Sequence, residues 1–424
     1  MQEIVMDDKR TIDLRLALEG GTPLRSTPLP PWPVFDQADI ELVGAVLRSG
    51  KVSYWTGSQG RLFEQEFARL IGCRHAVAMS NGSVALEAAL AALDIGPGDE
   101  VIVTARSFVA SAGCCVMRGA VPVFADVDPT SGNITPRTVR SAMSPRTRAI
   151  IAVHLAGWPC DMDPIMELAA EQGLRVIEDC AQAHGATYKG RTVGSIGHAA
   201  AFSFCQDKIL TTGGEGGMLT TNDRDVWQAA WSYKDHGKDY EAVQRPGGVG
   251  VFRWVHQSIG TNGRMTEMQA AVGRSMLRKL PDWLVTRRRH ASVLNGHLGR
   301  MPELRISIPP RTVQHSYYKY YAFVRPERLR DGWSRDRIVQ ALQAEGIPCG
   351  SGICPEIYRE KAFETRRLGP ARRLTTAKQL GETSLMLPVH PTLTRTDILD
   401  MCRALQKVLA AAAVQVPGTM QRAA

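Results

Sequence analysis

The chain has 424 residues, of which 44% are hydrophobic and 22% charged, the composition of a globular protein long enough for one large and one smaller domain. Its formal net charge is +9, but the longest basic run is 287–289, which a helix face explains, so nucleic-acid binding is not expected. The nine cysteines form no CxxC pair and have no matching histidine cluster, which argues against a disulfide framework or a metal site and favours a reducing cytoplasm.

The first 34 residues contain five prolines and are expected to form an extended arm. Asp7, Asp8 and Arg10 stand where a signal peptide would have its apolar core. No apolar run approaches the roughly 18 residues that a membrane helix needs. We therefore expect a cytoplasmic protein without membrane contact.

Strand and helix patterns alternate through the next part of the chain. Apolar runs predict strands, and segments with helical periodicity lie between them. Strands are expected at 75–80, 100–104, 121–127, 149–154 and 176–179, and helices at 84–93, 108–117 and 164–172. This alternation predicts an α/β domain whose mostly parallel sheet is sandwiched by helices. Ligands of such sheets bind beyond the carboxyl ends of the strands.

Beyond about Gly263 the pattern changes. Two amphipathic helices are expected at 265–280 and 283–298, followed by a strand at 317–325, a helix from about Ser334, and another strand region after 344–348. This order predicts a smaller C-terminal α+β domain after a long connecting helix. We place the arm at 1–34, the large domain at 35–295 and the small domain at 296–424.

Lys208 lies in the most informative segment. A short apolar strand ends at Ser203, the lysine follows five positions later, and a glycine-rich turn comes next. A lysine in an apolar stretch loses hydration, which favours the neutral amine that condenses with a carbonyl. A serine at a strand end suits a phosphate ester. A lone lysine usually lies on the surface, but together these features are typical of a pyridoxal 5'-phosphate (PLP) site.

A second segment about 30 residues upstream strengthens this interpretation. A buried parallel strand ends in Asp179, and Gln182 follows three positions later. The ring of PLP acts as an electron sink only while its pyridine nitrogen is protonated, and an Asp carboxylate holds that proton. An isolated aspartate would more often begin a turn or cap a helix. The distance to Lys208 favours the cofactor role instead.

Gly82 and Ser83 lie at a strand-to-helix turn, where free backbone N–H groups and the helix dipole favour a phosphate. Ser83 is also expected to cap the helix, which is compatible with phosphate binding. Phe108 opens the helix after the next strand, where its ring can stack on the pyridine. Taken alone, a phenylalanine there fits a core position better.

With these residues in place, the chain resembles the DegT/StrS family of PLP-dependent sugar aminotransferases, which have the aspartate-aminotransferase-like fold, fold type I. The resemblance covers about Pro31 to Leu409. It rests on separate motifs at 81–83, 96–101, 122–128, 177–182, 202–204, 214–217 and 262–265.

The resemblance implies a role for each residue of the site. Lys208 matches the lysine that bonds the cofactor and later moves the substrate proton, Asp179 the acid on the pyridine nitrogen, and Gln182 the amide near the phenolic oxygen. The catalytic residues would be Lys208 and Asp179.

The same resemblance implies a phosphate cradle formed by Ser203, Gly82 and Ser83, and a stacking ring from Phe108. Asn262 matches an asparagine that reaches the cofactor phosphate of the neighbouring subunit, which implies a homodimer with shared active sites.

Two departures from the family pattern stand out. Asn81-Gly82-Ser83 replaces a frequent Ser-Gly-Thr and keeps the hydroxyl. A long segment before Asn262, which includes 234–238 and the glycine-rich 246–250, is expected to shape the acceptor pocket. Relatives that are dehydratases have histidine at the lysine position, so Lys208 argues against that activity.

The expected function is the transfer of an amino group from glutamate or glutamine to a keto sugar, favoured as nucleotide-linked, in amino-sugar, antibiotic or polysaccharide biosynthesis. A keto-cyclitol such as scyllo-inosose or 2-deoxy-scyllo-inosose stays open as acceptor, since 30–33 is similar to cyclitol aminotransferases. A PLP lyase and a regulatory relative are further alternatives. Candidate contacts to acceptor hydroxyls are His184, Trp158, Tyr54, Trp55, His315, Tyr317 and Tyr318.

Overall fold

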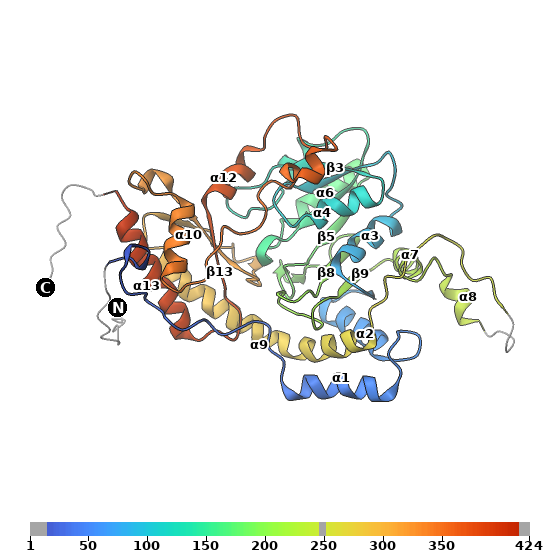
Figure 1. Ribbon diagram of the computed structural model, residues 1–424. Helices are drawn as coiled ribbons and strands as arrows, with labels where there is room; N and C mark the ends of the chain where they lie inside the picture. The colour runs from blue at the N-terminus through green and yellow to red at the C-terminus, as the bar shows by residue number, and fades with distance from the viewer. Residues whose placement is uncertain (1–14, 246–251, 415–424) are drawn as a thin grey trace.

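A seven-stranded sheet forms the centre of the computed structural model, which describes residues 15–245 and 252–414 (Figure 1). The strand order is β1-β9-β8-β5-β4-β2-β3, with β9 antiparallel to both neighbours and the remaining pairs parallel. The strands span His75–Met79 (β1), Glu100–Thr104 (β2), Val121–Ala125 (β3), Thr147–Val153 (β4), Arg175–Asp179 (β5), Ala199–Ser203 (β8) and Gly217–Thr221 (β9). The expected mostly parallel sheet is confirmed.

Helices cover both faces of this sheet, which explains why its strands are apolar almost throughout. One face packs against α3 (Gly82–Ala92), α4 (Ala110–Met117) and α7 (Arg224–Lys234). The other packs against α2 (Gln59–Ile71), α6 (Met162–Gln172) and the first half of α9 (Glu267–Leu298). Alternate side chains of one strand therefore enter different cores: Val77 faces α3, whereas Ala76 and Ala78 face α2.

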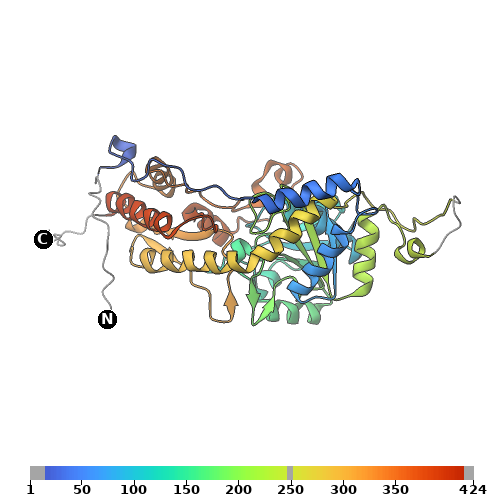
Figure 2. The ribbon, with the colours of Figure 1, turned by 90° about the horizontal axis from the view of Figure 1, so that it is seen from below.

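A second core lies at the other end of the molecule. An antiparallel sheet of β10 (Leu304–Ile306), β12 (Tyr320–Val324) and β13 (Ser384–Leu387) packs with α10 (Arg335–Ala344), α13 (Arg395–Ala412) and the second half of α9. Figure 2 shows α9 running between the two parts. The C-terminal α+β region is confirmed, while the domain boundaries at 34/35 and 295/296 stay a prediction.

The remaining elements, except for α1, are short. They are α1 (Gln37–Ser49), α5 (Pro136–Arg140), α8 (Tyr240–Gln244), α11 (Lys361–Glu364), α12 (Thr375–Thr383), a small sheet of β6 (Thr187–Tyr188), β7 (Arg191–Thr192) and β11 (Val313–Gln314), and 3-10 turns at Ala17–Glu19, Leu155–Gly157, Pro326–Arg328 and Ile357–Arg359. No helix among the described residues is long and apolar enough to cross a membrane.

The prediction of two helices at 265–280 and 283–298 is wrong, because α9 is one helix of 32 residues with Pro281 inside it. An internal proline removes a hydrogen bond and costs about 3 kcal/mol. Buried Leu277, Leu280 and Leu284 flank the proline and pack into the core, which offsets that cost.

Two strand predictions in the C-terminal region also differ from the observed structure. The strand expected at 317–325 begins only at Tyr320, because Tyr317 has a left-handed φ of 50° that an extended strand cannot accommodate. After 344–348 the chain forms only an isolated bridge between Gly350 and Met386. Pro348 lacks the N–H that a strand would use there.

The described part of the N-terminal arm lies against the C-terminal region. Arg25 forms ion pairs with Asp397 (2.8 Å) and Asp400 (3.0 Å) of α13. Residues 1–14 of the predicted arm, the glycine-rich segment 246–250 and residues 415–424 of the predicted small domain lie outside the described residues.

Candidate active site

The carboxyl ends of β5, β8 and β1 bring most of the predicted site residues together. Asp179 ends β5, and Ser203 ends the neighbouring strand β8. Gly217 of β9 pairs with both Met79 and Ser203, so the turn after β1 lies beside Ser203. The site therefore forms where the strands end, as expected for an α/β sheet.

Asp179 is buried, and both of its carboxylate oxygens accept hydrogen bonds. The Ser111 hydroxyl donates to Oδ2 at 2.7 Å, and the Ala181 N–H donates to Oδ1 at 3.1 Å. Ser107 lies 3.0 Å from Ser111 and extends this chain of hydroxyl groups. These hydrogen bonds hold the carboxylate in one orientation. A fixed orientation is what a carboxylate needs if it is to keep a proton on a ring nitrogen.

Gln182 is oriented by the backbone of the neighbouring turn. Its Oε1 accepts a hydrogen bond from the Ala156 N–H at 2.8 Å. Because the amide oxygen is occupied, the NH2 group is the part that can donate to a ligand. A donor is what the phenolic oxygen of a PLP ring needs, so Gln182 fits its predicted role.

Lys208 lies half-buried in the turn after β8, with Nζ 4.8 Å from the centre of the Tyr318 ring. Its backbone is held by two hydrogen bonds: its N–H donates to Cys205 at 3.1 Å, and its carbonyl accepts from Nε1 of Trp32 at 3.0 Å. Lys319 is the other lysine beside the same ring, at 4.9 Å. Geometry alone does not separate the two amines; the sequence motif selects Lys208.

His184 belongs to the core behind this turn. Its ring is 1% exposed and lies 5.6 Å from the rings of Phe202 and Phe204. Burial, together with the nearby charge of Lys208, lowers the pKa of the imidazole to about 3. His184 is therefore neutral, and neither of its buried ring nitrogens has a hydrogen-bond partner among the described residues.

Gly82, Ser83 and Ser203, the proposed phosphate cradle, lie close enough together to surround a phosphate group. A Cβ on Gly82 would stand 2.7 Å from Cβ of Ser203, so only glycine allows the two segments to approach. Asn81 caps α3 by accepting from the Val84 N–H at 2.9 Å. The expectation that Ser83 is the cap is thus wrong, because Asn81 takes that position. Ser83 lies exposed in the first turn, beside the N–H groups that bind anions.

Phe108 and Asn262 border the site from two other loops. Phe108 precedes α4 and is 59% exposed, so it is not a core residue and its ring is free to stack on a ligand. Asn262 is also exposed, and the next residue, Gly263, accepts a hydrogen bond from the Ser80 N–H at 2.8 Å. Asn262 therefore lies near the β1–α3 turn of its own chain.

Comparison with known proteins identifies the family. Residues 33–406 match the DegT/DnrJ/EryC1/StrS aminotransferase family. This chain belongs to that family. The resemblance found in the sequence is confirmed, and the protein is an aminotransferase.

Three relatives illustrate the match. GDP-perosamine synthase from Caulobacter vibrioides is 38% identical over 84% of this chain and 92% of its own. L-glutamine:2-deoxy-scyllo-inosose aminotransferase from Streptoalloteichus tenebrarius is 34% identical over 93% of this chain and 98% of its own. The X-ray structure of the aminotransferase from Psychrobacter cryohalolentis has a TM-score of 0.89 at 51% identity and covers 91% of this chain and 100% of its own. The expected aminotransferase fold is confirmed.

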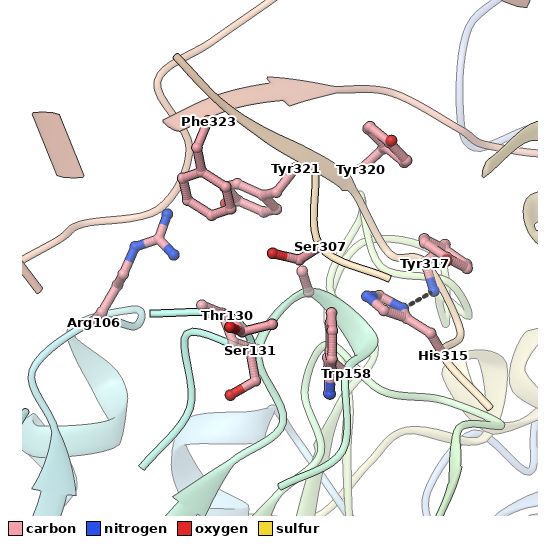
Figure 3. A pocket seen from close by; sticks show the side chains of 12 residues that line it. Arg106, Thr130, Ser131, Trp158, Ser307, His315, Tyr317, Tyr320, Tyr321 and Phe323 are labelled. Carbon is pink, nitrogen blue, oxygen red and sulfur yellow. Dashed lines mark hydrogen bonds between the residues drawn. The ribbon is translucent and has the colours of Figure 1, made fainter. Parts of the chain in front are cut away.

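The candidate contacts to an acceptor fall into separate places in the aminotransferase. Trp158, His315 and Tyr317 line one cavity (Figure 3). Tyr318 lies beside Lys208. Tyr54 and Trp55 instead line a different hollow, together with Trp227, Trp231 and Tyr240. The seven candidates therefore do not form one pocket.

Two residues beside the candidate site were not predicted from the sequence. Ser111 positions Asp179, and Arg106 is 1% exposed beside the cavity of Figure 3. The sequence did contain a signal for Arg106. This arginine stands between Ala105 and Ser107 in a strand-to-helix turn whose other residues are small or apolar. Arginine is rarely buried without a functional or pairing reason.

Proposed function

We propose that this aminotransferase uses PLP to move an amino group from glutamate or glutamine to a keto sugar, with a nucleotide-linked sugar as the favoured acceptor. The observation that carries the proposal is the convergence of Asp179, Gln182 and Ser203 with the Lys208 turn at one sheet edge. Gly82 and Ser83 complete the site with a cradle that fits a phosphate. These groups match what a PLP-dependent transfer needs.

PLP, when bound, supplies a protonated pyridine ring that draws electrons away from the carbon bearing the amine. Asp179 keeps the proton on the pyridine nitrogen, and Gln182 donates a hydrogen bond to the phenolic oxygen. Lys208 holds the cofactor in the resting enzyme and then acts as the base that removes the substrate α-proton. Ser203, Ser83 and the first N–H groups of α3 bind the phosphate.

The choice of acceptor rests on the relatives. A GDP-sugar enzyme at 38% identity supports a nucleotide-linked keto sugar, in amino-sugar, polysaccharide or antibiotic biosynthesis. A 2-deoxy-scyllo-inosose enzyme at 34% identity supports the cyclitol alternative and glutamine as donor. Parallel transamination assays distinguish these acceptors. They compare a nucleotide-linked keto sugar, the same keto sugar without its nucleotide diphosphate, and a keto-cyclitol.

We propose a homodimer in which Asn262 binds the phosphate of the partner's cofactor. Helix α8 projects from the body in both views (Figures 1 and 2), and residues 252–259 follow it in the described part of the chain. Among residues 252–259, the side chains of Phe252, Trp254 and Ile259 are 74%, 91% and 94% exposed. Apolar exposure of this kind marks a protein interface. We also propose a cytoplasmic location, which the nine free cysteines support.

The absorbance spectrum of the purified protein tests the function. A band near about 410 nm that moves to about 330 nm on addition of L-glutamate or L-glutamine is expected for an amine-accepting PLP enzyme. A band that responds to neither donor would contradict the proposed donors. The absence of a band after addition of PLP would refute the cofactor assignment.

A further inference from the structure

Arg106 is a buried cation that has no partner of opposite charge among the described residues. It follows β2 and is 1% exposed. Its Nε and Nη2 are buried without a hydrogen-bond partner in the described part of the chain. The guanidinium stacks on the rings of Tyr321 and Phe323, with distances of 5.1 and 6.0 Å to the ring centres. Aromatic faces do not replace the hydrogen bonds that buried guanidinium N–H groups require.

The surroundings of Arg106 raise the positive potential further. Burial, together with the nearby charges of Arg335 and Arg305, lowers the pKa of its guanidinium. Asp128 is the acid near Thr130 and Ser131, but its Oδ1 already accepts from both backbone N–H groups and from the Ser131 hydroxyl. Among the described residues, no carboxylate pairs with Nε or Nη2 of Arg106.

A small cavity opens beside the guanidinium (Figure 3). Its volume is about 30 Å³, and polar groups from Thr130, Ser131, Ser307 and His315 line it. Arg106 and Ser307 point toward each other across it. Ser307 accepts from Arg305 at 3.1 Å, so its own hydroxyl proton remains available to a ligand.

His315 adds a further donor. Its Nδ1 accepts from the Tyr317 N–H at 2.7 Å, and burial lowers the pKa of its ring to about 3, so the ring is neutral. The proton of a neutral ring whose Nδ1 accepts must lie on Nε2. Nε2 is therefore a donor, and this side of the ring turns toward the cavity in Figure 3.

The cavity borders the proposed active site. Arg106 is two residues before Phe108 and next to Ser107, whose hydroxyl leads through Ser111 to Asp179. Ala156, which lines the cavity, donates its N–H to Gln182. A group bound at Arg106 would therefore lie beside the residues that hold Asp179 and Gln182 in place.

We propose that Arg106, with Ser307 and His315, forms a carboxylate-binding subsite of the active site. A guanidinium binds a carboxylate through two parallel hydrogen bonds. A cavity of this volume holds roughly two waters, which suits a carboxylate group. The carboxylate comes from the amino-acid donor or from a carboxylated acceptor, and the subsite deepens the proposed function on which it rests.

The test uses the full-length protein and two variants, Arg106→Gln and Arg106→Lys. Arg118→Gln is the matched control, because Arg118 also has a buried Nε without a partner in the described residues and stacks on Tyr233 at 5.5 Å. Calorimetric titration with glutarate, a carboxylate that cannot donate an amine, measures binding directly. Wild type and Arg118→Gln should bind it, whereas Arg106→Gln should bind on the order of 30-fold more weakly. Arg106→Lys should fall between, since lysine keeps the charge and loses the paired geometry.

Steady-state kinetics with varied donor and varied acceptor identify the source of the carboxylate. If the donor supplies it, Arg106→Gln raises the KM for L-glutamate and L-glutamine and leaves that of the acceptor unchanged; a carboxylated acceptor gives the opposite pattern. The proposal is overturned if wild type does not bind glutarate, or if Arg106→Gln binds it as tightly as wild type. Because glutarate binding needs no turnover, a wild type that binds it without transferring an amine would refute the proposed function and keep the subsite.

Discussion

At the scale of single residues, Lys208 and Lys319 provide the sharpest comparison, because their amines lie 4.8 and 4.9 Å from the same Tyr318 ring. We expect Lys208→Ala to lose the absorbance band near about 410 nm, since that amine is the one proposed to bond PLP. Lys319→Ala should keep the band. The absorbance spectra of both variants are measured with added PLP, and circular dichroism verifies that both are folded. A band retained in Lys208→Ala would mean that the lysine is misassigned.

Substitutions of Asp179 and of Ser111 should lower turnover by different amounts. Asp179→Asn removes the charge that keeps the pyridine nitrogen protonated, so turnover should fall by several orders of magnitude. Ser111→Ala removes one hydrogen bond to a carboxylate that keeps its other bond to Ala181, so the loss should be about tenfold. Steady-state rates at saturating donor and acceptor measure both; near-normal turnover of Asp179→Asn would contradict its role.

At the scale of elements, the close approach of α3 and β8 predicts the effect of Gly82→Ala. The added Cβ would stand 2.7 Å from that of Ser203, so one segment must move and the cradle must widen. Affinity for PLP should fall more than tenfold, and the melting temperature of the protein without cofactor should also fall, since overpacking of this kind costs about 1–3 kcal/mol. Ser83→Ala is the milder comparison, since it removes a hydroxyl and leaves the backbone in place. Equal PLP affinity of Gly82→Ala and wild type would show that the phosphate binds elsewhere.

Sequence patterns predicted the elements whose local signals are strong. β2 has the predicted bounds 100–104, because an apolar run stands between turn residues. The division of α9 failed since tertiary packing around Pro281 outweighs the local cost of proline. Asp179, Gln182 and Ser203 could be placed because strand ends converge. The sequence around Arg106 marks the arginine as unusual, but its lack of a partner becomes visible only when β12 is packed against it.

At the scale of the whole molecule, the proposed sharing of active sites can be tested by mixing two variants. Lys208→Ala removes the amine of its own site, and Asn262→Asp places a negative charge where the partner's cofactor phosphate would bind. Each variant alone should have little activity. In a hybrid dimer, however, one site would combine Lys208 from one subunit with Asn262 from the other.

Co-expression of the two variants with different affinity tags, followed by purification through both tags, isolates that hybrid. One of its two sites is complete, so it should recover about half of the wild-type activity per dimer. If Asn262 serves the site of its own chain, as its position near the β1–α3 turn also allows, both sites of the hybrid carry a defect and activity does not recover. A fully active monomer in sedimentation experiments would exclude shared sites altogether, and the exposed Trp254 would then need another partner.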